Sequence, residues 1–213
     1  MARIRVGVLA SGRGSNFQSI ADAVARKELD VELAVLICNM PGAAVLDRAK
    51  VAGVPAVVID HREYGKDREA WEREAVRILR EHRVDLVVFA GFMRLVTPYF
   101  VSEFPNRILN IHPSLLPAFP GAHGQRDALA HGVKVSGLTI HFVDATLDGG
   151  PIVLQKAVPV RDDDSEEALA ARILEWEHRM YPLAVRLFAE GRLQVEGRRV
   201  VVDWSGMERP PEP

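Results

Sequence analysis

The sequence predicts an open, mostly parallel, doubly wound α/β sheet with an antiparallel C-terminal extension. Three observations support this fold class. Apolar runs at residues 3–9, 31–38 and 84–89 have the composition of strands buried in a parallel sheet. Segments with apolar residues at helical spacing separate these runs, as in proteins in which strands and helices alternate. A glycine-containing loop joins the first predicted strand to the first predicted helix.

The remaining elements follow along one expected domain, residues 1–205. We expect helices at residues 17–27, 42–51 and 67–82, strands at 55–59 and 107–111, and a short helix at 124–131. Strands at 135–143 and 152–160 form a hairpin-like extension of the sheet. A long helix begins at residues 164–167, and Pro182 predicts a kink or break in it because proline lacks a backbone N–H. Residues 193–202 predict a hairpin and residues 206–213 a flexible tail.

The composition excludes several classes of protein. The chain has 213 residues, 48% hydrophobic and 26% charged, and a formal net charge of -2, which argues against a nucleic-acid backbone as the main partner. We see neither a membrane-spanning segment nor an export signal. One cysteine, Cys38, excludes an internal disulfide and fits the cytoplasm. The seven histidines show no paired ligand spacing, so we expect no metal.

The loop after the first strand reads Gly12-Arg13-Gly14-Ser15-Asn16. Glycines let a backbone approach a ligand closely, and the free amides at the start of a helix favour an anion, so one interpretation is a phosphate site. The other is a tight turn with a helix cap at Ser15 or Asn16. The dinucleotide fingerprint is excluded because Phe17 stands in place of its third glycine, and no Gly-Lys-Ser/Thr motif is present.

A second loop, residues 90–98, follows the apolar strand at residues 84–89. It offers the apolar residues Phe92, Met93, Leu95 and Val96 with a single cation, Arg94, which would suit a flat ligand carrying carboxylates. The alternative is that the apolar side chains are core packing and Arg94 is a surface charge. On the residues of this loop alone, the second interpretation is favoured.

The third motif, Asn110-Ile111-His112-Pro113, is the most informative of the chain. Alternation along a strand places Asn110 and His112 on the same side, and the prolines that follow make a stiff loop. Asp148 lies in a later turn-rich loop, where it is either a turn former or a partner for a histidine. A carboxylate beside an imidazole favours the imidazolium, and a neutral amide beside both can stabilise an oxyanion. This set of residues suits acyl transfer.

Together these stretches resemble the phosphoribosylglycinamide formyltransferases, a family of 10-formyltetrahydrofolate-dependent enzymes of purine synthesis. The resemblance rests on the glycine loop, on residues 90–94, 110–117 and 147–151, and on Glu177-His178 before Tyr181-Pro182. It implies a Rossmann-like formyltransferase fold, with the nucleotide side in the N-terminal half and the folate and catalytic loops in the C-terminal half. It also implies transfer of a formyl group from 10-formyltetrahydrofolate to the amine of phosphoribosylglycinamide.

The resemblance also implies roles for individual residues. Asn110 and His112 would polarise the formyl oxygen, and Asp148 would raise the pKa of His112 and help to organise a water that moves a proton. The ribonucleotide would be held by Gly14, Ser15, Asn16 and Glu177. The folate would be held by Arg68, Met93, Arg94, Leu95, Val96 and Asn110. The substrates are small molecules, the only cofactor is the folate cosubstrate, and the chain is expected to be a monomer or a homodimer.

Two positions depart from the family pattern. Arg13 stands where many relatives carry a smaller polar residue, and Gln125 stands where relatives often carry a second histidine after the one matching His123. The rival functions are a formyltetrahydrofolate hydrolase and a binding protein without turnover. A methionyl-tRNA formyltransferase is disfavoured, because that enzyme typically adds an RNA-binding domain for which this chain has neither the length nor the charge.

Overall fold

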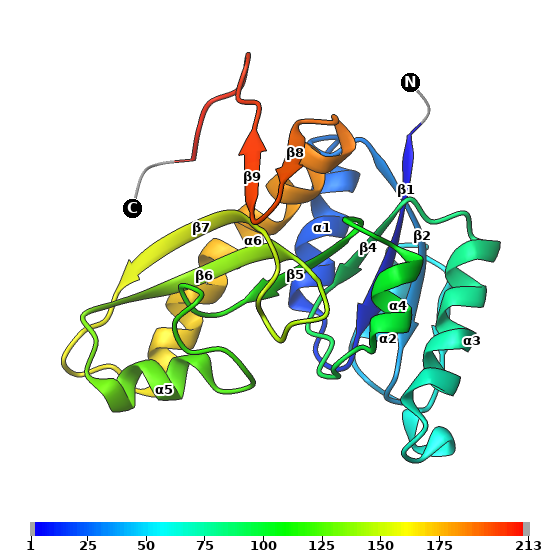
Figure 1. Ribbon diagram of the computed structural model, residues 1–213, viewed down its shortest axis with the longest axis horizontal. Coiled ribbons are helices and arrows are strands. Elements are labelled where there is room, and N and C mark those ends of the chain that lie inside the picture. Colours follow the sequence, from blue (N-terminus) through cyan, green and yellow to red (C-terminus); the bar gives the residue numbers. More distant parts are fainter. Residues whose placement is uncertain (1–2, 211–213) are drawn as a thin grey trace.

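The computed structural model describes residues 3–210, and in this range nine strands form one sheet in the order β3-β2-β1-β4-β5-β6-β7-β9-β8 (Figure 1). The strands are β1 (Ile4–Ala10), β2 (Val31–Cys38), β3 (Ala56–Val58), β4 (Leu86–Phe89), β5 (Ile108–His112), β6 (Val135–Phe142), β7 (Ile152–Pro159), β8 (Leu193–Glu196) and β9 (Arg199–Val202). The helices are α1 (Ser15–Ala25), α2 (Val45–Val51), the 3-10 helix η1 (His61–Tyr64), α3 (Arg68–Glu81), α4 (Pro98–Glu103), α5 (Gly124–His131) and α6 (Glu166–Ala189).

The sheet has a parallel half and an antiparallel half that meet at β5. β1 pairs in parallel with β2 and β4, and β4 pairs in parallel with β5. β5 then pairs antiparallel with β6, and β6 pairs antiparallel with β7. The predicted fold class, a mostly parallel α/β sheet with an antiparallel extension, is confirmed.

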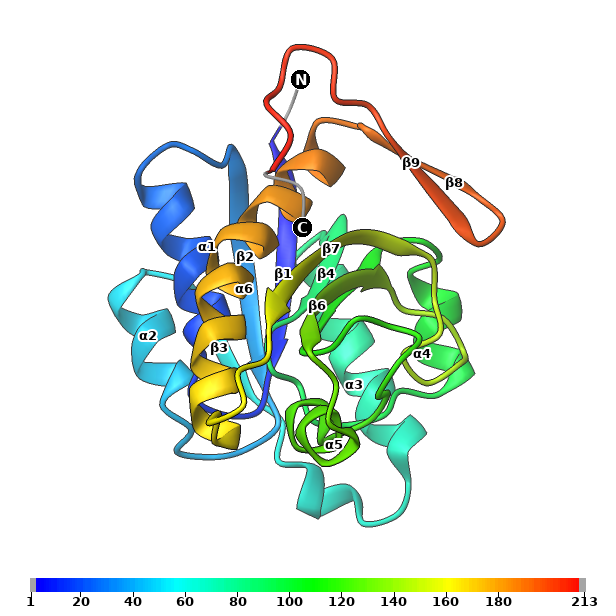
Figure 2. The ribbon, with the colours of Figure 1, turned by 90° about the vertical axis from the view of Figure 1, so that its left-hand side faces the viewer.

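Helices cover both faces of the parallel half (Figure 2). On one face α1, α2 and α6 bury apolar side chains such as Phe17, Ile20 and Ile173 against the sheet. On the other face α3 and α4 bury Trp71, Leu79 and Phe100. The strands between them are apolar on both faces because each face meets a helix layer.

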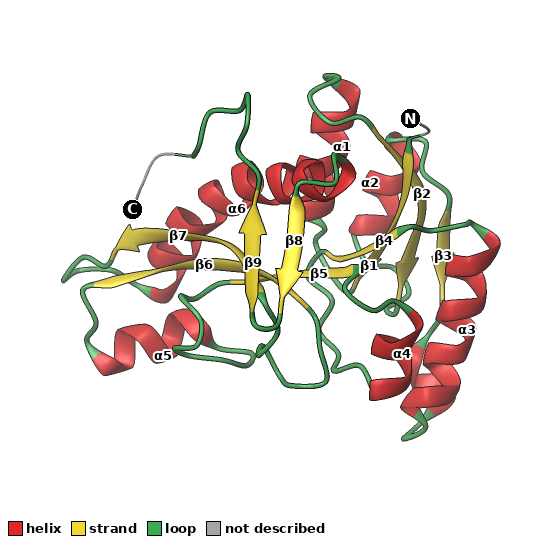
Figure 3. Ribbon diagram, turned by 45° about the horizontal axis from the view of Figure 1, so that its top comes forward, coloured by secondary structure: helices red, strands yellow, loops and turns green. Residues whose placement is uncertain are grey.

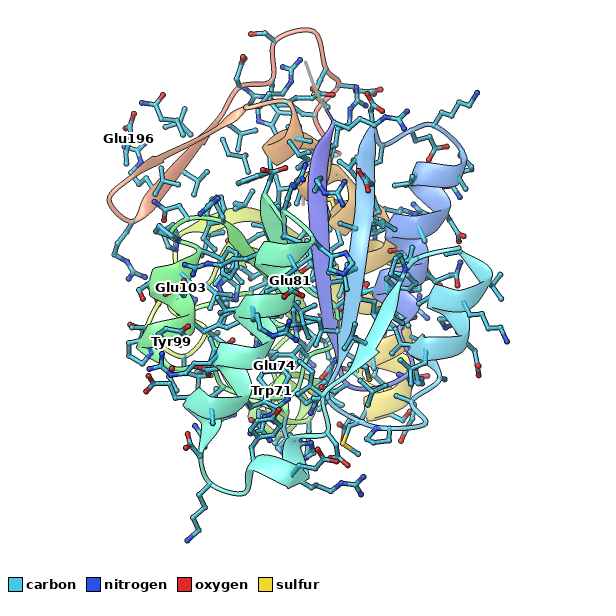
Figure 4. All side chains as sticks on the ribbon, turned by 90° about the vertical axis from the view of Figure 1, so that its right-hand side faces the viewer. Trp71, Glu74, Glu81, Tyr99, Glu103 and Glu196 are labelled. Atoms are coloured by element: carbon cyan, nitrogen blue, oxygen red, sulfur yellow. The ribbon has the colours of Figure 1, made fainter. Side chains whose placement is uncertain are left out.

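The outer face of α3 carries paired acidic and basic side chains, of which Glu74 and Glu81 are labelled in Figure 4. Asp67 caps α3 by accepting a hydrogen bond from the backbone N–H of Ala70, and Trp71 points inward with its Nε1 donating to the carbonyl of Ile59 at 2.8 Å. On the outside, Glu74 and Glu81 both pair with Arg77. These charges form a solvated helix face.

The break expected at Pro182 was wrong: α6 runs from Glu166 to Ala189 with Pro182 inside it. The cost of the missing backbone hydrogen bond is offset by packing, because Met180, Tyr181 and Ala184 around the proline are buried against the sheet. Other predicted helix ends also shifted. The first helix begins at Ser15, two residues early, and the second at Val45, three residues late.

The C-terminal strands form a hairpin that extends past β7 (Figure 3). β9 joins the sheet through a short parallel pairing of Arg199 with Ile152. Beyond the hairpin, residues 206–210 contain neither helix nor strand, and Met207 packs against the core. Residues 211–213 of the expected tail lie outside the described residues. Between residues 3 and 210, no helix has the length and apolar character needed to cross a membrane.

Tyr181 joins helix α6 to the centre of the sheet. Its side chain is fully buried, and its hydroxyl lies 2.8 Å from the carbonyl oxygen of Phe89 and 2.9 Å from that of Leu109. These two carbonyls belong to neighbouring strands: Phe89 is the last residue of β4, and Leu109 is the second residue of β5. One hydroxyl therefore holds the helix against the two strands that lead into the loops at this edge of the sheet.

Replacing Tyr181 with Phe is expected to lower the free energy of unfolding by about 1–3 kcal/mol, because a buried donor is lost and two carbonyls lose a partner. Urea denaturation measures the change. Tyr99→Phe is the control, since Tyr99 is half-exposed on α4 beneath Arg73 and should change stability by less than about 0.5 kcal/mol. Equal losses in the two variants would contradict the role given to the Tyr181 hydroxyl.

Candidate active site

Asn110, His112 and Asp148 meet at the border between the two halves of the sheet. Asn110 and His112 are both on β5, where Asn110 lies opposite Phe89 of β4 and opposite His141 of β6. Asp148 lies in the loop between β6 and β7. His112 Nδ1 is 3.5 Å from an Asp148 carboxylate oxygen. His112 and Asp148, 36 positions apart along the chain, are thus brought together because β6 runs antiparallel beside β5.

His112 is 4% exposed and has a polar partner on each side of its ring. Nε2 lies 2.8 Å from the carbonyl oxygen of Phe119. A carbonyl can only accept, so Nε2 carries a proton. Nδ1 faces the Asp148 carboxylate, and that contact is favourable when Nδ1 carries a proton as well. Both ring nitrogens of His112 therefore face oxygen acceptors, an arrangement from which the ring can donate hydrogen bonds.

Asp148 connects the loop between β6 and β7 to the loop after β5. Its backbone is in the left-handed region, with φ of 48°, and its Oδ2 accepts a hydrogen bond from the backbone N–H of Gly121 at 2.7 Å. Gly121 belongs to the proline-rich loop after β5. Behind Asp148, Gly150 has no room for a side chain, since a Cβ there would lie 1.8 Å from the carbonyl oxygen of Phe142. The carboxylate is thus placed by a tightly packed turn.

His141 determines how the Asn110 amide is oriented. Its Nδ1 lies 2.9 Å from the Phe142 carbonyl oxygen and therefore donates, which leaves Nε2 of a neutral ring as an acceptor. Burial lowers the pKa of His141, so the neutral ring is favoured. Asn110 Nδ2 lies 3.2 Å from that nitrogen and donates to it. Sequence analysis assigned no role to His141, although it alternates with Thr139 on one face of the same strand.

The glycine loop ends in a helix whose first amides have no side-chain cap. Gly14 is the N-cap of α1 and adopts φ of 73°, in the left-handed region. A Cβ at Gly14 would lie 2.4 Å from the Val45 side chain, so a larger residue does not fit there. Because glycine brings no side-chain acceptor, the backbone N–H groups at Ser15 and Asn16 are available to an anion. The alternative of a cap by the Ser15 or Asn16 side chain was wrong.

Asn16 and Glu177 form a buried pair between α1 and α6. Asn16 Nδ2 donates to Glu177 Oε2 at 2.8 Å, while Asn16 Oδ1 is buried without a hydrogen-bond partner. Burial raises the pKa of the Glu177 carboxyl, and the hydrogen bond from Asn16 opposes that shift. The Asn16 side chain therefore points to α6.

A cavity of about 390 Å³ runs along α1 from its first residue. It is lined by Ser15, Gln18, Ser19, Asp22, Arg26, Arg48 and His178. Arg48, on α2, donates to the Arg13 carbonyl at 2.8 Å and to the Gln18 side chain at 3.2 Å. His178 Nε2 is buried without a partner. Sequence reasoning gave no role to Arg48, because its place beside the glycine loop depends on how α2 packs.

The loop after β4 exposes the apolar side chains for which the sequence offered two interpretations. Met93 is 77% and Leu95 53% exposed, so these two are not core packing, whereas Phe92 is buried against Trp71. Arg94 and Val96 are half-buried. Arg68 is exposed at the start of α3, one turn before Glu72, whose carboxylate accepts a hydrogen bond from the Thr97 backbone at 2.7 Å.

The structure thus brings Asn110, His112 and Asp148 into one cluster, and Gly14, Ser15, Asn16 and Glu177 into another. Of the two departures from the family pattern, Arg13 is exposed with its carbonyl bound by Arg48, and Gln125 is half-buried in the first turn of α5. Across residues 3–210, no group of three or more His, Cys, Asp or Glu side chains is arranged to hold a metal ion.

The comparisons with known proteins agree with this geometry. A family model described as formyl transferase matches residues 4–185. The fold and the site define a formyl transferase, and the chain belongs to that family. Within it, the chain is similar to the phosphoribosylglycinamide formyltransferase of Escherichia coli K12, with 41% identity over 209 residues, 98% of this chain and 97% of that protein. The resemblance inferred from the motifs is confirmed.

Two further relatives extend the comparison. The crystal structure of glycinamide ribonucleotide transformylase 1 from Symbiobacterium toebii is 52% identical, with a TM-score of 0.91 over 94% of both chains. The trifunctional purine biosynthetic protein adenosine-3 of Drosophila melanogaster is 44% identical over 191 residues, 89% of this chain. The chain spans only 14% of the length of that protein, which therefore contains much that this chain does not match.

Glu177→Gln is expected to change how stability depends on pH. Burial raises the pKa of Glu177 above its ordinary 4.5, so above that pH the native state keeps a proton that the unfolded chain has released. Wild-type stability then falls as pH rises from about 4.5 through the native pKa, and the variant lacks this loss. Its stability relative to wild type should increase between about pH 4.5 and pH 7 in urea titrations. For the control Glu175→Gln, at an exposed position of the same helix, the free energy of unfolding should depend on pH as it does in wild type. The same pH dependence in Glu177→Gln as in wild type would contradict the expectation.

Proposed function

We propose that the chain transfers the formyl group of 10-formyltetrahydrofolate to the amine of phosphoribosylglycinamide, giving N-formylglycinamide ribonucleotide and tetrahydrofolate in purine biosynthesis. The observation that carries this proposal is the cluster of Asn110, His112 and Asp148, in which His112 is buried and the other two side chains are partly buried. The uncapped amides of α1 and the exposed apolar loop after β4 follow neighbouring strands of the same sheet. The full-length relative named for this reaction supports the same assignment.

The reaction is an acyl transfer between two nitrogens. The amine of the ribonucleotide attacks the formyl carbon, a C–N bond forms, and the carbonyl oxygen takes up the electron pair. Asn110 donates to this oxygen with the N–H that His141 leaves free. A well-placed donor of this kind commonly contributes roughly 3–4 kcal/mol to the transition state.

Collapse of the intermediate breaks the bond from the formyl carbon to the folate nitrogen. The attacking amine loses a proton and the folate nitrogen gains one, so the reaction needs no other co-reactant. His112 is the proton donor: its Nε2–H, which donates to the Phe119 carbonyl without substrate, turns to the developing oxyanion. Asp148 balances the charge of the imidazolium and helps to organise a water that carries the proton between the two nitrogens.

The ribonucleotide binds with its phosphate at the start of α1. The backbone N–H groups at Gly14, Ser15 and Asn16 donate to the phosphate, and the Glu177 carboxylate binds the glycinamide ribonucleotide nearby. The cavity that begins at Ser15 supports this placement, because Arg48 and the unpartnered Nε2 of His178 line it. Arg48 places a positive charge beside the start of α1, which attracts a phosphate there even though Asp22 also lines the cavity and the chain as a whole carries a net charge of -2.

The folate binds against the loop after β4. Exposed Met93 and Leu95 contact its flat ring, Val96 adds apolar contact, and Arg68 and Arg94 supply charge for its carboxylates. Asn110 borders both substrates. We place all of this in one formyltransferase domain, residues 1–205, of a cytoplasmic monomer or homodimer with small-molecule substrates, without a metal, a membrane or a nucleic acid as partner.

The test is a folate absorbance assay with 10-formyltetrahydrofolate, with and without phosphoribosylglycinamide, followed by the mass of the product. We expect conversion that requires the ribonucleotide and yields its formylated form. Conversion without the ribonucleotide would mean a hydrolase. Binding of both ligands without conversion would mean a binding protein.

Asp148→Asn is expected to lower kcat by about 10²- to 10⁴-fold with little change in KM, because the variant no longer balances the imidazolium of His112. Steady-state kinetics measure the effect. Asp144→Asn is the matched control in the same loop, where the side chain accepts a hydrogen bond from the Thr146 backbone and Asn keeps that acceptor. An unchanged kcat in Asp148→Asn would overturn the mechanism.

Arg48→Gln is expected to raise KM for the ribonucleotide about 10-fold, because hydrogen bonds to a charged group contribute about 1.5–3 kcal/mol. KM for the folate should stay within about two-fold of wild type. Arg26→Gln is the control: Arg26 lines the far end of the same cavity, but its guanidinium is paired with Glu28. If the two variants weakened the ribonucleotide equally, Arg48 would have no special role at the phosphate.

A further inference from the structure

The two loops assigned above to different substrates meet at a single side chain, Ser11. Ser11 is the first residue after β1 and opens the glycine loop, whereas Met93 lies in the loop after the neighbouring strand β4. The Met93 backbone N–H donates to Ser11 Oγ at 2.9 Å, and the Ser11 backbone N–H donates to the Gly91 carbonyl at 3.1 Å. Both the backbone and the side chain of Ser11 are therefore bound to the folate loop.

The direction of these hydrogen bonds is fixed by chemistry. A backbone N–H can only donate, so Ser11 Oγ accepts from Met93 and its own hydroxyl proton must point elsewhere. It points to Asn39 Oδ1, 2.6 Å away. Asn39 is 3% exposed and directly follows β2. Three adjacent parallel strands thus end in one chain of hydrogen bonds, from Met93 through Ser11 to Asn39.

The backbone of Asn39 is fixed by two hydrogen bonds. His61 Nδ1 lies 2.9 Å from the Asn39 carbonyl oxygen and donates to it. The Asn39 backbone N–H donates to the carbonyl of Ala10. With its backbone held in this way, Asn39 accepts the Ser11 hydroxyl proton at Oδ1, and Ser11 in turn presents a lone pair to the Met93 amide.

The other end of the folate loop is fixed from α3. Glu72 is 2% exposed and accepts hydrogen bonds from both the backbone N–H and the hydroxyl of Thr97. The segment between Met93 and Thr97 is thus held at both ends, while its Met93 and Leu95 side chains are exposed. Exposed side chains on a fixed backbone are suited to ligand contact, because less conformational freedom is lost on binding.

We propose that Ser11 is a positioning residue for the folate. Its hydroxyl holds the backbone at Met93 so that the segment 93–96 presents its side chains to the ligand before the ligand arrives. The inference rests on the proposed function for the identity of that ligand. The hydrogen bond itself does not, so it can be tested independently of any activity.

The experiment combines amide hydrogen exchange with kinetics in Ser11→Ala, Ser11→Thr and Asn39→Ala. In Ser11→Ala the Met93 amide should exchange at least about 10-fold faster in the free protein. KM for 10-formyltetrahydrofolate should rise about 3- to 10-fold, since a neutral hydrogen bond contributes about 1 kcal/mol. The kcat and KM for the ribonucleotide should stay within about two-fold. Asn39→Ala should show the same pattern, and Ser11→Thr, which keeps the hydroxyl, should restore wild-type values.

Ser102→Ala is the matched control. Its hydroxyl donates to the Tyr99 carbonyl on α4, outside the folate loop, and its loss should leave both KM values unchanged. Faster exchange at Met93 with an unchanged folate KM would overturn the proposal, as would an equal rise in both KM values. If the wild-type protein bound no folate, the proposed function would fail instead, and the difference in exchange between wild type and Ser11→Ala would still report the hydrogen bond.

Discussion

The constraint on which the site depends is the position of β5 between a parallel and an antiparallel neighbour. β4 and β5 run the same way, so the loop after β4 and the end of β5 lie at one edge of the sheet. β6 runs back along β5 and places His141 opposite Asn110. The turn between β6 and β7 then places Asp148 beside His112. If β6 ran parallel to β5, the loop after β6 would lie at a different position relative to the end of β5.

Several polar groups in the loops at the site form hydrogen bonds to a different loop, so these loops fix one another. Asp148 binds the Gly121 amide, His112 binds the Phe119 carbonyl, and Ser11 binds both Met93 and Asn39. Left-handed backbone at Asp148 and Phe119 is tolerated because these contacts fix the turns from several sides. A site preorganised in this way loses little freedom when small ligands bind.

The electrostatics of the site are local. The chain carries a net charge of -2, yet Arg48 lies beside the uncapped start of α1. On the adjacent helix α6, burial raises the pKa of Glu177. Both site histidines lie near the Asp148 carboxylate, His112 at 3.5 Å and His141 at 3.9 Å, and burial lowers the pKa of His141. The two have different hydrogen-bonding roles because their other partners differ: His112 Nε2 donates to the Phe119 carbonyl, whereas His141 Nε2 accepts from Asn110.

The sequence by itself determined the fold class, the glycine loop and the residues Asn110, His112 and Asp148, because strand periodicity, glycine and proline placement and motif spacing are local properties. It did not determine that Pro182 stays inside α6, since burial around Tyr181 outweighs the local preference of proline. Nor could it assign Arg48, His141 or Ser11, whose side-chain hydrogen bonds to other elements and loops span 28 to 82 positions along the chain. Such contacts arise only when the sheet order and helix packing are set, and those are decided by the tertiary structure.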